Sequence, residues 1–453
     1  MNSDFENGKI GKLLFKLALP CIIAQLVNVL YNIVDRIFIG KLPNGEIAMA
    51  GVGIAFPIIL IIAAFSALIG MGGAPIAAIK MGEKKNGEAE KILSNSFSML
   101  IIIGLILTVV FLIFKEPILY AFGASNQTIG YAQDYITIYL IGTVFVQIAL
   151  GMNPFLNTQG FTKMSMFTVM IGAATNIVLD PIFIFTFNMG VKGAALATLI
   201  AQMVSAIFVL KFIFGKKTIL KIRKEFLMPR IKIILPIVSL GISPFIMQAT
   251  ESLVLISLNT KLQAYSGDLA VGAMTIMASI MQIIQLPLLG LTQGAQPIIS
   301  YNYGAKNLDR VKTTIKILIK CSLAYSLVMT SILMLFPETI VSIFNNTPEL
   351  MEITVWSIRI YFVGTFIFGA QIACQQSFLA LGEAKSSLLL ALLRKIVLLL
   401  PLIFILPNFF EDKLFAVLLA EPIADITAVT ITTISFFIFY KKNLRNKVHE
   451  EIT

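Results

Sequence analysis

Asn176, Asp180 and Pro181 interrupt a long apolar stretch near the middle of the chain. A spacing of four residues puts Asn176 and Asp180 on the same face of a helix, one turn apart. Pro181 has no N–H group, so the carbonyl oxygen of Ile177 loses its helical hydrogen bond. Carboxylate, amide and free carbonyl oxygens suit a small cation, and the carboxylate also suits a proton. The stretch therefore indicates a site for a small positive ion.

A second acidic residue lies in the first apolar stretch, where polar residues recur every three or four positions as Gln25, Asn28, Asn32 and Asp35. This spacing puts them on one helical face, which avoids lipid because a charged group in a bilayer costs ~2.5 to 3.5 kcal/mol. At ~1.5 Å per residue, Asp35, Asp180 and Thr198 lie roughly 8, 12 and 9 Å below the outer surface. The three residues are thus expected at one level.

We expect a shared site for a proton or a sodium ion in the outer half of the membrane, formed by Asp35, Asn176, Asp180 and Thr198. Two adjacent carboxylates resist joint ionisation, so a proton or a cation is expected with them. The simpler alternative is structural. In that case Asp180 only hydrogen-bonds a kinked helix, and Asn176 and Thr198 only pack.

The composition indicates which elements hold these residues. Of 453 residues, 57% are hydrophobic and 13% are charged, and the mean hydropathy is +0.89. An average soluble domain has about 25% charged residues. Apolar runs of about 20 residues, long enough to span a bilayer as a helix, recur along the chain. We predict an all-α polytopic membrane protein with twelve transmembrane helices.

The basic residues predict the orientation. They give a net charge of +11 and cluster before the first span, between spans two and three, between six and seven, and after eight and twelve. The cluster between spans six and seven is the densest: Lys211, Lys216, Lys217, Lys221, Arg223, Lys224, Arg230 and Lys232. Because cytoplasmic loops are enriched in Lys and Arg, both termini are predicted to be cytoplasmic, and the charge does not indicate nucleic acid as a partner.

Residues for covalent chemistry are scarce. Cys21, Cys321 and Cys374 fall in apolar spans without motif spacing, which indicates buried small side chains rather than disulfides or metal ligands. His449, the sole histidine, lies in the tail. A membrane-embedded transferase would need convergent His, Asp or Cys residues, and the sequence offers no such set. We therefore predict a protein that is not an enzyme and has no cofactor.

Internal similarity divides the chain into two halves. Several residues recur 222 positions later: Pro75, Gly82, Gly142, Gly160 and Lys163 match Pro297, Gly304, Gly364, Gly382 and Lys385. Six spans precede a basic linker and six follow it, so equivalent helices cross the membrane in the same direction. We predict a first lobe (1–215), a cytoplasmic linker (216–231) and a second lobe (232–453), related by a pseudo-two-fold axis along the membrane normal. The linker is either an interfacial helix or a solvated loop.

Polar residues also lie within spans of the second half. Glu251 follows Pro236 by fifteen residues, as Asp35 follows Pro20, so Glu251 is interpreted as the counterpart of Asp35. Lys395, Glu421 and Asp425 offer charged partners, so buried ion pairs are the alternative to a functional role for Glu251 and Arg394. We expect a substrate cavity between the lobes, lined by Gln25, Asn28, Asn32, Glu251, Met274, Met277, Met281, Gln282 and Arg394. Ordinary packing is the alternative for the methionines.

The chain resembles the bacterial branch of the multidrug and toxic compound extrusion (MATE) transporters over essentially its full length. An ordered set of features carries the resemblance: Pro20 with Asp35, residues 70–75 with Gly82, Asn176 with Asp180 and Pro181, residues 193–195 with Thr198, and in the second half residues 293–295, Gly304 and 422–425. The resemblance implies a cation-coupled antiporter of the MOP flippase superfamily. Such a protein exports amphipathic, often cationic drugs from the bacterial cell membrane by alternating access. We expect a monomer.

The resemblance also implies roles for residues. Asp35, Asn176, Asp180 and Thr198 match the cation or proton site in the first lobe of the family. Asn153 matches a further polar position and joins the expected cavity lining, although its estimated depth lies much nearer the cytoplasm. The coupling ion is either H⁺ or Na⁺.

The second half departs from one branch of the family. That branch pairs the glutamate of span seven with an aspartate of span ten. Here Glu251 is present, but span ten has Gln371, Cys374 and Gln375, so a sodium site of that design is not expected. The close alternative function is a lipid-linked precursor flippase of the same superfamily, which would need further helices and several cationic side chains in the central cavity.

Overall fold

The computed structural model describes residues 2–344 and 347–445, and this part of the chain folds into helices and loops without a strand. The α-helices are α1 (Asn2–Asn7), α2 (Ile10–Gly40), α3 (Gly45–Gly82), α4 (Asn86–Ala121), α5 (Ile129–Ile141), α6 (Thr143–Thr158), α7 (Thr162–Pro181), α8 (Val191–Ile213), α9 (Ile231–Gly304), α10 (Leu308–Leu335), α11 (Pro337–Ser342), α12 (Pro348–Tyr361), α13 (Thr365–Ala380), α14 (Ala384–Leu392), α15 (Leu400–Ile405) and α16 (Lys413–Phe439). Wider π-helical segments follow three of them, at Ile182–Thr186, Leu393–Leu399 and Tyr440–Arg445.

The described residues account for the twelve predicted spans. Ten helices are long and apolar enough to cross a membrane, and two bent pairs, α5 with α6 and α12 with α13, raise the number to twelve. The bends are 61° and 52°. The bends fall at Gly142 and Gly364, which are equivalent in the repeat. Glycine destabilises a helix because it loses more backbone conformational entropy on folding than any other residue. The predicted all-α membrane fold is confirmed.

Spans seven and eight form the single long helix α9, which is broken at Gly267. There φ is 70° and ψ is −161°, a conformation that side-chain-bearing residues avoid. The two parts, Ile231–Gly267 and Leu269–Gly304, each qualify as a span. The glycine therefore turns a continuous run of helix into two crossings.

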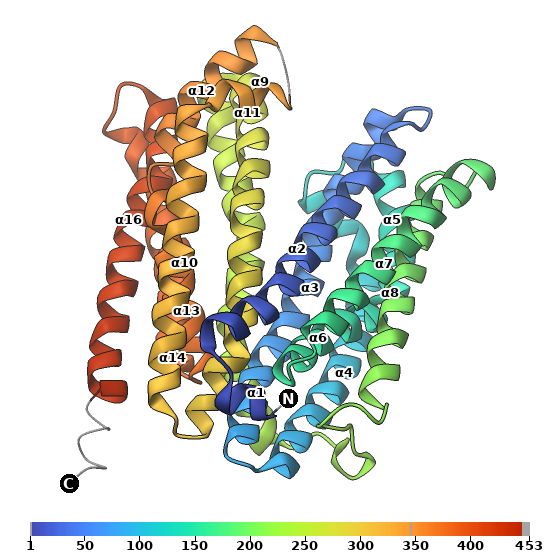
Figure 1. Cartoon of the computed structure of the whole chain (residues 1–453). Helices are drawn as coiled ribbons and strands as arrows, with labels where there is room; N and C mark the ends of the chain where they lie inside the picture. Colours follow the sequence, from blue (N-terminus) through green and yellow to red (C-terminus); the bar gives the residue numbers. More distant parts are fainter. Residues whose placement is uncertain (1, 345–346, 446–453) are drawn as a thin grey trace.

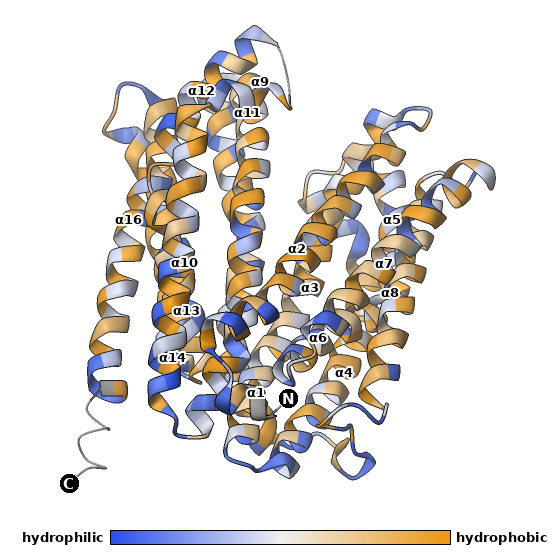
Figure 2. Cartoon of the chain, viewed as in Figure 1, coloured by the Kyte–Doolittle hydropathy of each residue, from blue (hydrophilic) through white to orange (hydrophobic). Residues whose placement is uncertain are grey.

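Two bundles make up the molecule (Figure 1). Helices α2–α8 form the first lobe and α9–α16 the second, and the lobes meet near α1 and diverge toward the opposite end. Apolar residues dominate the long helices, while hydrophilic residues gather at the helix ends and loops (Figure 2). Exposed apolar side chains such as Phe15 and Ile113, at 58% and 66%, fit a surface in contact with lipid.

The contact between the lobes is formed by α2 and α3 of the first lobe against α9 of the second. At two equivalent glycines the backbones touch: a Cβ on Gly82 would lie 2.0 Å from the Tyr301 carbonyl oxygen, and one on Gly304 would lie 2.0 Å from that of Ile79. Further along, the Gln25 amide donates to Gln293 Oε1 at 3.2 Å. The recurrence of these glycines in the sequence thus reflects close packing between the two lobes.

The linker is an irregular loop, so its interpretation as an interfacial helix is wrong. Between α8 and α9 the structure has only a short 3₁₀ turn, Lys224–Phe226. Buried side chains of the first lobe bind the linker backbone: Gln159 Oε1 accepts from the N–H groups of Ile219 and Leu220, both at 2.9 Å, and Asn95 Oδ1 accepts from that of Arg230 at 2.8 Å. These bonds give the linker backbone partners that a helix would otherwise supply.

Candidate functional site

Four polar side chains of the first lobe meet in its interior. Asp35 comes from α2, Asn176 and Asp180 from α7, and Thr198 from α8, and each is at most 8% exposed. Asn176 Nδ2 donates to Asp180 Oδ1 at 3.2 Å and to Thr198 Oγ1 at 3.3 Å. The Asp35 and Asp180 carboxyl groups lie within hydrogen-bonding reach of each other. The structure therefore brings together the four residues that the sequence had grouped.

The acidic pair has no salt bridge among the described residues, although the neighbouring Arg36 acts electrostatically on Asp35. Within the described residues, neither Asp35 nor Asp180 forms an ion pair, and Asp35 Oδ1, Asp180 Oδ2 and Asn176 Oδ1 have no hydrogen-bond partner. A buried carboxylate without a partner is costly, and two side by side are costlier. Two carboxyls, an amide oxygen and a hydroxyl form an oxygen-rich set that fits a proton or a small monovalent cation.

The backbone at this site departs from regular α-helix. Pro181 ends α7, and the chain continues as the π-helical segment Ile182–Thr186. Proline removes one helical hydrogen bond, and π-helical turns occur often at functional sites because they shift side chains out of regular register. The irregular backbone therefore begins directly after Asp180, one of the residues that form the site.

The site lies between two cavities of the first lobe. One, of about 280 Å³, is lined by Asp35, Arg36 and Phe56 among others. The other, of about 40 Å³, is lined by Asn28, Asn153 and Asn176 among others. Tyr31, Thr198 and Gln202 line both. The acidic cluster therefore adjoins both cavities.

Asn153, which the resemblance places at a further polar position, lines this smaller cavity together with Asn28 and Asn176. It belongs to α6, which follows the 61° bend at Gly142.

Several residues at the site were not picked out from the sequence. Tyr135, which is 4% exposed, hydrogen-bonds Thr198, and Tyr31 and Tyr139 line the larger cavity. Arg36 also lines that cavity, with its guanidinium carbon 5.2 Å from the Phe56 ring centroid. Tyr135 and Tyr139 are spaced by four residues, so a search for paired hydroxyls on one helical face would have found them.

The residues expected to line a cavity between the lobes have different surroundings. Gln25 bridges to Gln293 of the second lobe, and Gln282 is exposed on α9. The side chain of Asn32 lies outside the described part of the structure. The three methionines lie instead in the hydrophobic core of the second lobe. Met274, Met277 and Met281 are 1%, 1% and 8% exposed, so ordinary core packing accounts for their presence.

Two other predicted residues, Glu251 and Arg394, take part in a network of ion pairs inside the second lobe. Arg394 Nε donates to Asp425 Oδ1 at 2.7 Å and Arg394 Nη2 to Glu421 Oε1 at 3.0 Å. Lys395 pairs with Glu251. Both basic residues belong to the π-helical segment Leu393–Leu399. Glu251 and Arg394 are therefore both ion-paired, although not with each other.

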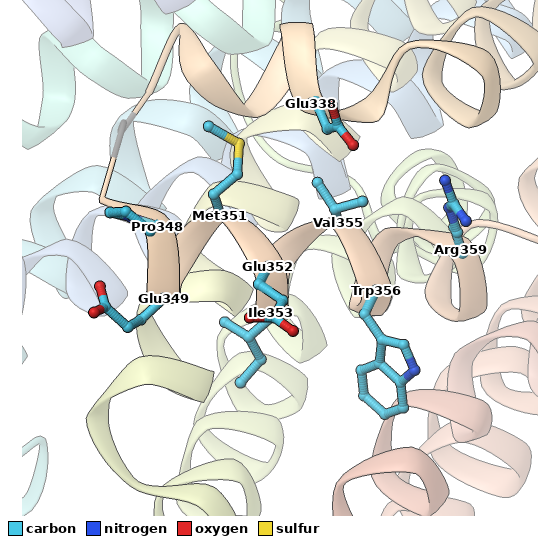
Figure 3. Close-up of a pocket in the computed structure, with 9 residues that line it drawn as sticks. All are labelled: Glu338, Pro348, Glu349, Met351, Glu352, Ile353, Val355, Trp356 and Arg359. Atoms are coloured by element: carbon cyan, nitrogen blue, oxygen red, sulfur yellow. The ribbon is translucent and has the colours of Figure 1, made fainter.

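A larger hollow, of about 890 Å³, lies along α11 and α12 and is lined by Glu338, Glu349, Glu352, Trp356 and Arg359 among others (Figure 3). Its glutamates are exposed and lie in the second lobe, remote in the fold from α2 and α7. This surface hollow therefore takes no part in the buried acidic site.

Comparisons with known proteins agree with this architecture. The MatE family model matches residues 20–182 and 243–405. The chain is 27% identical to the multidrug export protein MepA of Staphylococcus haemolyticus, covering 98% of this chain and 96% of the relative. It is 25% identical to MepA of Staphylococcus aureus (strain NCTC 8325 / PS 47), covering 94% of each chain. A MATE structure in a bent conformation and an outward-facing MATE family transporter are 24% identical and superpose with TM-scores of 0.90, over 96% of this chain and 97% of each.

The two family matches are of equal length, one for each half of the repeated pattern. Both matches together cover most of the chain, and they lie one in each lobe. The chain belongs to the MATE family of multidrug transporters.

Proposed function

We propose that this protein is a cation-coupled multidrug antiporter, driven by H⁺ or Na⁺, that exports amphipathic and often cationic compounds. The observation that carries the proposal is the buried pair of Asp35 and Asp180, which forms no salt bridge among the described residues and adjoins two cavities of the first lobe. The names of the MepA relatives support drug export as the activity.

In this mechanism the acidic pair is loaded from the larger cavity. A proton or sodium ion at Asp35 and Asp180 neutralises them and removes the repulsion between the carboxylates. Pro181 and the π-helical turn after it give α7 a point at which it can change its bend. For a neutral drug, one inward cation contributes about 2.3 kcal/mol per 100 mV, which supports more than a tenfold uphill gradient. A 1:1 exchange for a monocationic drug moves no net charge and is driven by the concentration gradient of the coupling ion.

The lobes move relative to each other in this proposal. We assign residues 1–215 to the first lobe, 216–231 to the linker and 232–453 to the second, with both termini in the cytoplasm. The hydrogen bonds from Gln159 and Asn95 to the linker support its moving with the first lobe. If the basic loops lie in the cytoplasm of a bacterial cell, as we propose, the end at which the lobes diverge faces outward, which fits an outward-facing state.

The proposal is tested by ethidium efflux from energised cells that express the protein. Asp180→Asn is expected to reduce efflux to the level of cells without the protein, because the amide cannot exchange a proton or carry a charge. The matched control is Asp134→Asn, since Asp134 is half-exposed and pairs with Lys192 at 3.4 Å away from the site. Equal efflux in wild type and Asp180→Asn, at equal membrane expression, would overturn the coupling role.

A further inference from the structure

The segment that precedes the first span is bound to the second lobe, although it leads into the first. The Phe5 ring of α1 stacks on the Tyr301 ring of α9, with centroids 5.3 Å apart, and each residue is 2% exposed. Tyr301 Oη donates to Glu6 Oε1 at 2.9 Å. We call residues 5–8 the N-terminal strap. Its side chains are thus fixed on a helix of the opposite lobe.

The backbone of the strap is bound as well. Asn302 Nδ2 of α9 donates to the Phe5 carbonyl oxygen at 3.2 Å, and Arg310 Nη2 of α10 donates to the Gly8 carbonyl oxygen at 2.7 Å. Water can take the place of each of these partners once the segment is exposed, because a hydrogen bond to water is nearly as good as one within the protein. The strap is therefore a fastening that can open and close again.

The strap lies at the contact between the lobes. Figure 1 shows α1 at the end of the molecule where the two bundles meet. Tyr301 is also the residue whose carbonyl oxygen touches α3, since a Cβ on Gly82 would lie 2.0 Å from it. The end of α9 is thus held from two sides, by α3 and by the strap. Any opening of the lobes at this end has to break one or both of these contacts.

The helix that follows the strap connects the two lobes along its length. Near its beginning α2 packs on α9, where a Cβ on Gly294 would lie 2.4 Å from the Ala18 Cα. At its other end α2 belongs to the first lobe, and the Phe38 ring lies 6.3 Å from the Phe185 ring. Only Lys9 separates the strap from α2. The strap therefore ties the beginning of a first-lobe helix to the second lobe without slack.

The linker before α9 has the reciprocal arrangement. It leads into the second lobe but is bound by the first, where Asn95 Oδ1 accepts from the Arg230 N–H and Glu90 pairs with Arg223 at 2.9 Å. The linker is a long loop and can stay on the first lobe while α9 moves. The strap has no such loop behind it. Of the two segments, the strap is the one whose bonds must break when the lobes part.

We infer that the N-terminal strap is a latch, which holds the lobes closed at the end where they meet and releases the second lobe each time that end opens. On the proposed orientation this end faces the cytoplasm, so the latch sets how often the protein opens toward the compounds that it exports. The inference rests on the alternating access of the proposed function. It makes Phe5, Glu6 and Tyr301 gating residues that bind neither the ion nor the substrate.

The first test measures the opening itself. Spin labels are placed by Lys84→Cys and Lys306→Cys, at exposed and equivalent turns of the two lobes. Their distance distribution is recorded by pulsed electron paramagnetic resonance on the full-length protein in lipid. The native cysteines are first removed by Cys21→Ala, Cys321→Ala and Cys374→Ala. A longer distance then reports lobes that are open at this end.

Phe5→Ala is expected to raise the population at the longer distance at least tenfold. Tyr301→Phe, which removes only the hydroxyl group, is expected to raise it severalfold, and it decides the matter if Phe5→Ala does not fold. Tyr303→Phe is the matched control, because Tyr303 lies on the same helix without a hydrogen bond to the strap among the described residues. A strap that only adds stability would lower the unfolding temperature and leave the distances unchanged, which would overturn the inference.

The second test asks whether release is needed for transport. Glu6→Cys and Tyr301→Cys are joined by a bifunctional thiol reagent, and ethidium transport is measured in proteoliposomes with an imposed ion gradient. The crosslink is expected to abolish transport, and a reducing agent should restore it. Transport at the rate of the protein before crosslinking would overturn the latch. If the wild type transports no organic cation, the proposed function fails, and the label distances still decide whether the strap controls opening.

Discussion

The two lobes come from one repeated helical pattern but treat their buried acids in opposite ways. In the first lobe, Asp35 and Asp180 are accompanied by an amide and a hydroxyl and form no ion pair among the described residues. In the second lobe, Arg394 binds both Glu421 and Asp425. The same scaffold thus holds one acidic cluster that lacks a cation and another that contains its own.

This difference separates two roles that a buried carboxylate can have. An acid with a permanent cation is held in one charge state, whereas an acid without one changes state when a mobile ion arrives or leaves. We therefore expect the first lobe to respond to the proton or sodium gradient and the charged network of the second lobe to stabilise its fold. The variants below test this contrast, in order of decreasing effect on stability.

The largest effect is expected for Arg394→Met. Removing the arginine leaves Glu421 and Asp425 buried without their bonded cation, and breaking one partner of a buried pair costs about 3–5 kcal/mol. The variant should unfold at a clearly lower temperature in detergent, as followed by tryptophan fluorescence. Arg359→Met, which removes an exposed arginine, is the control. An unchanged unfolding temperature for Arg394→Met would show that the second-lobe network does not stabilise the fold.

A smaller loss of stability is expected at the contact between the lobes, where each lobe has an equivalent glycine. In Gly82→Ala, the added methyl group would lie 2.0 Å from the Tyr301 carbonyl oxygen, so the lobes must separate locally. Overpacking of this kind costs about 1–3 kcal/mol. The distance between spin labels on the two lobes near α1 should increase, and Gly304→Ala should act in the same way. In Gly87→Ala the added group meets nothing within 4 Å, so that variant should match the wild type.

The linker provides a test at the end where the lobes meet, because residues of the first lobe supply the side-chain acceptors for its backbone among the described residues. Gln159→Leu leaves the backbone N–H groups of Ile219 and Leu220 without their acceptor, at a cost of about 1–3 kcal/mol. Hydrogen exchange of residues 216–231 should become faster while the second lobe is unaffected. Gln127→Leu, in an exposed loop, is the control. Unchanged exchange would show that these bonds do not hold the linker.

The smallest effect on stability is expected for Asp35→Asn. Because Asp35 has no ion pair among the described residues, the amide removes a charge that the fold does not balance. The unfolding temperature should stay the same or rise, even as coupling is lost. A drop as large as that of Arg394→Met would mean that Asp35 has a stabilising partner and that the contrast between the lobes is wrong.

Much of the architecture was predictable because it depends on helix length and periodicity. Runs of about 20 apolar residues gave the twelve spans, and the four-residue spacing of Asn176 and Asp180 gave their shared face. Depth counted along straight helices brought Asp35 and Thr198 to the same level.

The contacts that individual side chains make could not be predicted from the sequence, because they depend on how the helices pack against one another. Nothing in the sequence distinguishes a methionine that lines a cavity from one in a core, and Met274 and Met277 belong to the core. Likewise, Arg394 and Lys395 are neighbours in sequence, yet the π-helical segment directs one to Asp425 and the other to Glu251.

The most direct test of the account is transport of tetraphenylphosphonium in proteoliposomes, with a pH gradient and a sodium gradient imposed separately. The wild type should accumulate it against its gradient under at least one of the two, and Asp35→Asn and Asp180→Asn should do so under neither while still binding it. Gradient-driven accumulation by either variant at the wild-type rate would contradict the central claim that the acidic pair of the first lobe couples the ion to export.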